Sequence, residues 1–140
     1  MSMTFSADYS DLLGKVQEAG RAGGKAVAFG LYDTAGMMAE AVKQSAMSLP
    51  FKGSTTAQIA AAVGIATFRS TGDGYQTSVS FDGYFAESGF PIPYFVNEVE
   101  NGTSRIPANP FVQRAFAQTI GPAEAKGNQT AEGIINDILK

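Results

Sequence analysis

A long stripe of apolar residues in the first third of the chain constrains the fold most. Between Lys25 and Ser48, apolar side chains recur every three or four positions, which is the spacing of one helix face. The stripe consists of Val27, Leu31, Ala35, Met38, Val42, Ala46 and Leu49. Gly30 and Gly36 each cost a helix about 1 kcal/mol relative to Ala, so we expect close packing against another backbone. Pro50 marks the helix end.

A strand with regular alternation is the second strong pattern. Tyr75, Thr77, Val79 and Phe81 alternate with Gln76, Ser78, Ser80 and Asp82, so one face of this strand is predicted to be buried. Ile65–Ser70 reads as the preceding strand, and Thr71–Gly74 supplies two glycines for a tight turn. The sequence therefore predicts an antiparallel hairpin.

Shorter elements are expected on both sides of these two patterns. Ser6 or Asp8 is a candidate cap for a first short helix that ends near Gly20. A second short helix is expected to start in the hydroxyl-rich segment 54–56 and to run through Val63. The segment Tyr94–Glu100 is predicted to be ordered, either as a strand or as one to two helical turns.

The C-terminal third reads as two helices. Pro110 fits the first position of a helix that runs from Phe111 to Thr119, and Gly121-Pro122 is expected to end it. After a linker at 126–128, residues 130–140 form a last amphipathic helix. Together the elements predict an α+β fold in which a long N-terminal helix packs on a small antiparallel sheet, with a C-terminal helix. We expect a single domain over residues 1–140, with 1–22 and 121–140 as mobile or interface-forming termini.

The composition excludes several chemistries. The chain has no Cys and no His, so its own side chains cannot build a tetrahedral zinc site, a Cys or Ser–His nucleophile, or a histidine acid–base pair. The net charge of −3 argues against a dedicated nucleic-acid clamp, which needs excess Lys and Arg. The charged fraction of 16% is below the usual share of about 25%, so part of the neutral surface is expected to contact other protein. No cofactor and no metal is expected.

Two sets of residues are candidate functional sites, one catalytic and one for binding nucleic acid. Glu98 and Glu100 lie two apart, as a catalytic pair might on a strand, but such pairs are more often solvated or ion-paired, here with Arg105 or Arg114. The aromatic residues from Tyr84 to Phe95 could stack on bases. However, no Lys or Arg lies between Arg69 and Arg105, so a subunit contact is the better interpretation.

The segment from Tyr94 to Ala115 carries a recognisable motif. It contains Val99-Glu100-Asn101-Gly102-Thr103, then Pro107-Ala108, then Pro110-Phe111. This order resembles the tail-component or tail-completion (neck) protein family of long-tailed double-stranded-DNA phages, to which protein Z of phage lambda also looks related. The resemblance covers roughly residues 25–119. Family members typically have an aromatic residue where this chain has Asn101. The motif and interface residues that follow from the resemblance are Tyr94, Glu98, Glu100, Gly102, Thr103, Pro107, Pro110 and Phe111.

The resemblance implies a non-enzymatic virion protein of the head–tail junction, made in the host cytoplasm. It implies a ring of copies, expected to be a hexamer, that contacts the adjacent tail-tube or terminator and head-connector proteins. Double-stranded DNA would pass through without sequence-specific binding. The residues themselves add that Gly102 permits a turn, that Thr103 caps locally, and that Pro107 and Pro110 hold Phe111 at a helix start.

Three alternatives stay open. The first is a tail terminator or connector ring of a neighbouring layer, which would share the gross α+β pattern. A different class is a small carboxylate-dependent hydrolase or a binding module for sugars or cations, which would depend on Glu98 and Glu100. A single-stranded nucleic-acid binder is the third and predicts steep salt dependence.

Overall fold

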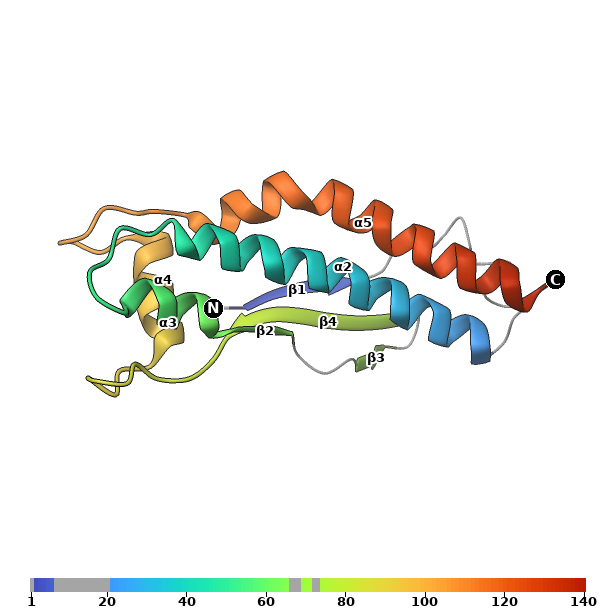
Figure 1. The fold of residues 1–140 in the computed structure, drawn as a ribbon, viewed down its shortest axis with the longest axis horizontal. Helices are drawn as coiled ribbons and strands as arrows, with labels where there is room; N and C mark the ends of the chain where they lie inside the picture. Colours follow the sequence, from blue (N-terminus) through green and yellow to red (C-terminus); the bar gives the residue numbers. More distant parts are fainter. Residues whose placement is uncertain (1, 7–20, 66–68, 72–73) are drawn as a thin grey trace.

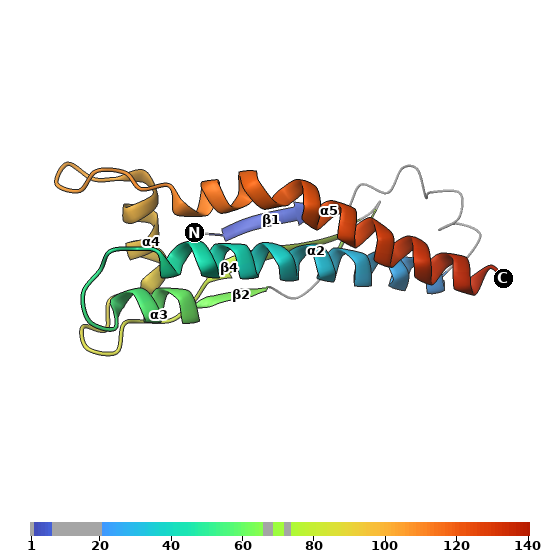
Figure 2. The same ribbon diagram turned by 45° about the horizontal axis from the view of Figure 1, so that its top comes forward.

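The apolar stripe folds into the helix that organises the molecule. The computed structural model describes residues 2–6, 21–65, 69–71 and 74–140 of the chain. In chain order the elements are β1 (Ser2–Ser6), α2 (Arg21–Met47), α3 (Thr55–Ala61), β2 (Val63–Ile65), β3 (Arg69–Thr71), β4 (Gly74–Phe81), α4 (Ile92–Asn101) and α5 (Phe111–Ile138). The molecule is elongated, with α2 and α5 side by side along its long axis (Figures 1 and 2). The predicted α+β class is confirmed.

Helix α2 buries the face that its periodicity predicts. All seven residues of the stripe, Val27 through Leu49, are buried. The backbone of α5 comes close to α2 at Gly30, because a Cβ placed on Gly127 of α5 would lie 2.5 Å from the Gly30 carbonyl oxygen. A Cβ on Gly36 would meet open space, so the close packing expected at Gly36 is not found.

The sheet is built around β4. Strand β1 pairs antiparallel with one edge of β4, with Ser2 opposite Ser80. Strand β2 and then β3 pair antiparallel with the other edge, through Val63 opposite Phe81 and Arg69 opposite Gln76. The alternation along β4 is as predicted, since Thr77, Val79 and Phe81 are buried while Gln76, Ser78 and Ser80 are half-buried. Helix α2 packs on the sheet.

The hairpin between β3 and β4 is confirmed, with differences in the first strand. The short helix was predicted to run through Val63, but α3 ends two residues earlier, at Ala61. Val63 is instead the first residue of strand β2, which precedes β3. Residues 66–68 and the turn residues 72–73 lie outside the described residues. Strand β1 was not predicted, and Ser6, a candidate helix cap, is its last residue. The expected helix that follows it, up to Gly20, also lies outside the described residues.

The predicted break in the C-terminal helix is wrong. Helix α5 continues for 28 residues through Gly121, Pro122 and the expected linker. Packing against α2 explains this, because Ala123, Gly127, Ala131 and Ile135 are buried at a spacing of four residues. Thr34 of α2 donates a hydrogen bond from its Oγ1 to the carbonyl oxygen of Ala123 at 3.0 Å. Thr130 likewise donates to Asp33 at 2.5 Å. Tertiary contacts therefore outweigh the local helix breakers.

The main core lies where α2, α4, the first half of α5 and the sheet meet. Phe111 is fully buried and contacts Phe81 edge to face, with ring centroids 6.0 Å apart. The segment Tyr94–Glu100, predicted to be either a strand or helical turns, lies in helix α4. Ile92, Val96 and Val99 form the buried face of this helix. Among the described residues, no helix combines the length and the apolar character that crossing a membrane requires.

Candidate functional site

The motif between α4 and α5 folds as one hydrogen-bonded unit. Glu100 is 2% exposed, and its two carboxylate oxygens accept hydrogen bonds from the backbone N–H groups of Val112 and Gln113, each at 2.9 Å. These two residues lie in the first turn of α5, whose N–H groups have no partner within the helix. A carboxylate there is also favoured by the helix dipole. Glu100 therefore caps α5 from a neighbouring helix.

The loop between the two helices has a fixed conformation. Gly102 has a φ of +78°, and a Cβ on it would lie 2.8 Å from the backbone nitrogen of Ala108. The Thr103 Oγ1 accepts hydrogen bonds from the backbone N–H groups of Arg105 and Ile106, at 3.1 and 3.0 Å. The Thr103 N–H donates to the Ile106 carbonyl at 2.8 Å. We call residues 103–107 the arginine loop; it extends from one end of the molecule (Figure 1).

Other bonds join this loop to the helices. The N–H of Asn109 donates to the Val99 carbonyl at 2.8 Å, and Arg114 donates to the Asn109 side chain at 2.6 Å. Ser45 of α2 donates to the carbonyl of Phe111 at 2.8 Å. The loop base is thus tied to both α4 and α2, while Arg105 and Ile106 remain exposed.

The structure separates the residues that the sequence grouped together. Gly102, Thr103 and Glu100 form the loop base, as expected for a structural motif. Pro110 was predicted to occupy the first position of the helix, but it is the N-cap residue, and α5 begins at Phe111. Phe111 is fully buried in the core. Pro107, Tyr94 and Glu98 are exposed, with Tyr94 at 67%.

The two carboxylates considered as a catalytic pair have different environments. Glu98 is exposed on α4, whereas both oxygens of Glu100 are engaged by backbone donors. The arginine partner expected for Glu100 is replaced by these backbone groups, and Arg114 bonds Asn109 instead. Within the described residues, no cluster of three or more His, Cys, Asp or Glu side chains could hold a metal ion.

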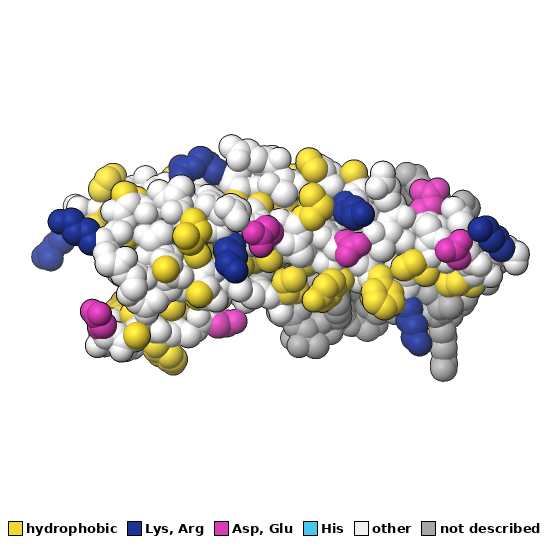
Figure 3. Space-filling view, in the orientation of Figure 1, with side chains coloured by type: hydrophobic (Ala, Val, Ile, Leu, Met, Phe, Trp, Pro, Cys, Tyr) yellow, Lys and Arg dark blue, Asp and Glu magenta, His cyan; other side chains and the backbone are white. Residues whose placement is uncertain are grey.

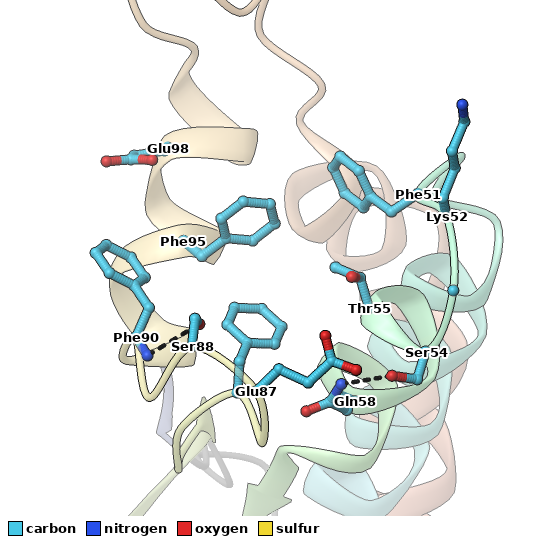
Figure 4. Close-up of a pocket in the computed structure, with 12 residues that line it drawn as sticks. Phe51, Lys52, Ser54, Thr55, Gln58, Glu87, Ser88, Phe90, Phe95 and Glu98 are labelled. Atoms are coloured by element: carbon cyan, nitrogen blue, oxygen red, sulfur yellow. Dashed lines mark hydrogen bonds between the residues drawn. The ribbon is translucent and has the colours of Figure 1, made fainter.

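An aromatic groove lies beside the loop between α3, α4 and the segment 83–91. It has a volume of about 710 Å³, and four phenylalanines contribute to its wall, namely Phe51, Phe85, Phe90 and Phe95. Phe95 contacts both Phe51 and Phe85 edge to face, with centroid separations of 5.3 Å. Figure 4 shows Glu87 pointing toward Gln58 across the groove, while Lys52 and Glu98 point away from its centre.

The aromatic residues between Tyr84 and Phe95 fall into a half-buried set and an exposed set. Phe85 is half-buried in the groove wall, whereas Tyr84 is 70% exposed and Phe90 is also exposed. Further large apolar side chains are exposed along α2, including Phe29 and Met47. On the face shown in Figure 3, hydrophobic side chains lie between singly scattered charges, with no continuous basic stripe on that face. Burial separates these two aromatic sets, and the sequence alone gave no means to assign them.

Comparison with known proteins gives no relative: no family model, no curated protein and no solved structure matches this chain.

Proposed function

We propose that the chain is a structural virion protein of a long-tailed DNA phage, which completes the tail and joins it to the head connector. In this proposal several copies, expected to be six, form a ring around the DNA channel. The ring contacts the tail-tube or terminator protein on one side and the connector on the other. The protein has no catalytic role.

The observation that carries the proposal is the preorganised motif. The residues that resemble the phage family, from Val99 to Phe111, are the residues that fix the arginine loop by backbone and side-chain hydrogen bonds. A loop that is already held by hydrogen bonds loses less conformational freedom on binding than an unstructured one, so it suits a repeated protein contact. The exposed Tyr84 and Tyr94 lie on elements at the same end of the molecule and add apolar contact area.

The buried role of Glu100 disfavours the hydrolase alternative. A general acid or base has to reach a substrate, and both oxygens of Glu100 already accept bonds from α5. Of the two carboxylates considered as a pair, only Glu98 is exposed to solvent. The described surface therefore supports a contact role better than a catalytic one.

A complementation experiment tests the proposal. Deleting the coding sequence from the phage genome should leave filled heads and finished tails unjoined in the lysate, as seen by negative-stain electron microscopy. Adding the purified chain should join them and restore infectivity. Wild-type yields of joined particles in the deletion strain would contradict the proposal.

A further inference from the structure

The arginine loop and the aromatic groove have complementary chemistry. The loop exposes a cation at Arg105 and an aliphatic side chain at Ile106, which is 39% exposed. The groove offers apolar aromatic walls together with the carboxylate of Glu87, while Glu98 and Lys52 line the groove but point away from its centre (Figure 4). A side chain such as Ile106 gains free energy by leaving water for an aromatic wall, and Arg105 would meet the opposite charge there.

The loop does not fill the groove of its own copy. None of residues 103–107 lines the groove, and in Figure 1 the loop between α4 and α5 extends outward from the end of the molecule. The hydrogen bonds of Thr103 and the close contact at Gly102 fix the loop in this outward conformation. A second copy carries the same loop, and the ring of copies proposed above brings that loop to this groove.

We propose that the arginine loop of one copy docks into the aromatic groove of the next, with Arg105 beside Glu87 and Ile106 against the phenylalanine wall. The inference rests on the proposed ring and names the contact that closes it. Because loop and groove are different surfaces, the contact is heterologous and repeats from copy to copy until a ring closes. The groove volume of about 710 Å³ is in the range that accommodates several side chains.

Disulfide cross-linking tests this contact directly, because the chain has no native cysteine. The variant carries Ile106→Cys and Ser88→Cys, one exposed residue in the loop and one at the groove. A disulfide requires the two Cα atoms to lie within about 7 Å. Under mild oxidation we expect a ladder of linked copies on a non-reducing gel. The matched control combines Ile106→Cys with Ala125→Cys, which is exposed on α5, and should give no ladder.

Charge reversal tests the ion pair within the same variant. Arg105→Glu should slow cross-linking about fivefold, the effect of one exposed ion pair. Adding Glu87→Arg should restore the original rate. Unchanged rates in both variants would overturn the pairing of Arg105 with Glu87.

The same oxidation in joined particles separates this inference from the proposed function. Particles that contain the double-cysteine chain and join normally, yet give no ladder, would overturn the loop-and-groove contact while leaving the ring function intact. In that case the groove is free for a protein of an adjacent layer. Absence of the wild-type chain from joined particles would instead overturn the proposed function itself.

Discussion

Replacing Glu100 with Ala should destabilise the fold strongly, whereas Glu98→Ala should not. Glu100 is buried and accepts two hydrogen bonds at 2.9 Å from the first turn of α5. Each bond to a charged acceptor is worth about 1.5–3 kcal/mol, and the variant leaves two donors without a partner. Part of this loss is offset because no carboxylate has to be desolvated, so we expect a net loss of about 2–4 kcal/mol.

Urea unfolding followed by far-ultraviolet circular dichroism measures this difference. In a thermal melt of a chain of 140 residues, the same loss lowers the melting temperature by roughly 7–14 °C. Glu98→Ala is the matched control on the same helix, and a change at this exposed position should stay within about 0.5 kcal/mol. Glu100→Gln keeps one acceptor oxygen, so its free energy of unfolding should lie between those of Glu98→Ala and Glu100→Ala. Equal stability of the Glu98 and Glu100 variants would refute the capping role.

Three further predictions concern the backbone. Gly127→Ala should lower the free energy of unfolding in urea by about 1–3 kcal/mol, because the new Cβ overlaps Thr34 Oγ1 and lies 2.5 Å from the Gly30 carbonyl oxygen. The control Gly133→Ala places its Cβ in open space and should be neutral or stabilising. Pro122→Ala should stabilise the chain by about 1 kcal/mol or more if α5 is continuous, and an unchanged midpoint would favour two separate helices. Gly102→Ala should cost more than Gly89→Ala, since both residues have positive φ but only Gly102 meets the backbone of Ala108; equal losses of about 1 kcal/mol would contradict the close contact.

Local periodicity was enough to predict the elements that bury one regular face. Spacing alone indicates the buried side where a pattern is repeated often enough. This holds for the helical stripe from Val27 to Leu49 and for the strand alternation from Thr77 to Phe81. Strand β1 was missed because its five residues offer only Met3 and Phe5 as alternating apolar positions.

Features that depend on distant contacts were not predictable from local patterns. Gly121-Pro122 signals a helix end, yet the fit of Gly127 against Gly30 keeps α5 continuous. Nothing in the spacing of Glu98 and Glu100 indicates that one is exposed and the other caps a helix twelve residues away. Gly102 and Thr103 were predicted correctly as turn residues, because their roles are local.

An electron cryomicroscopy map of the neck of intact virions would show whether this chain forms part of the head–tail junction. We predict a closed ring of this fold between tail tube and head connector, with α2 and α5 paired along each subunit. We further predict that residues 103–107 of each subunit contact the next copy. A neck whose density is fully accounted for by other proteins, with this chain absent from the purified particles, would contradict the account.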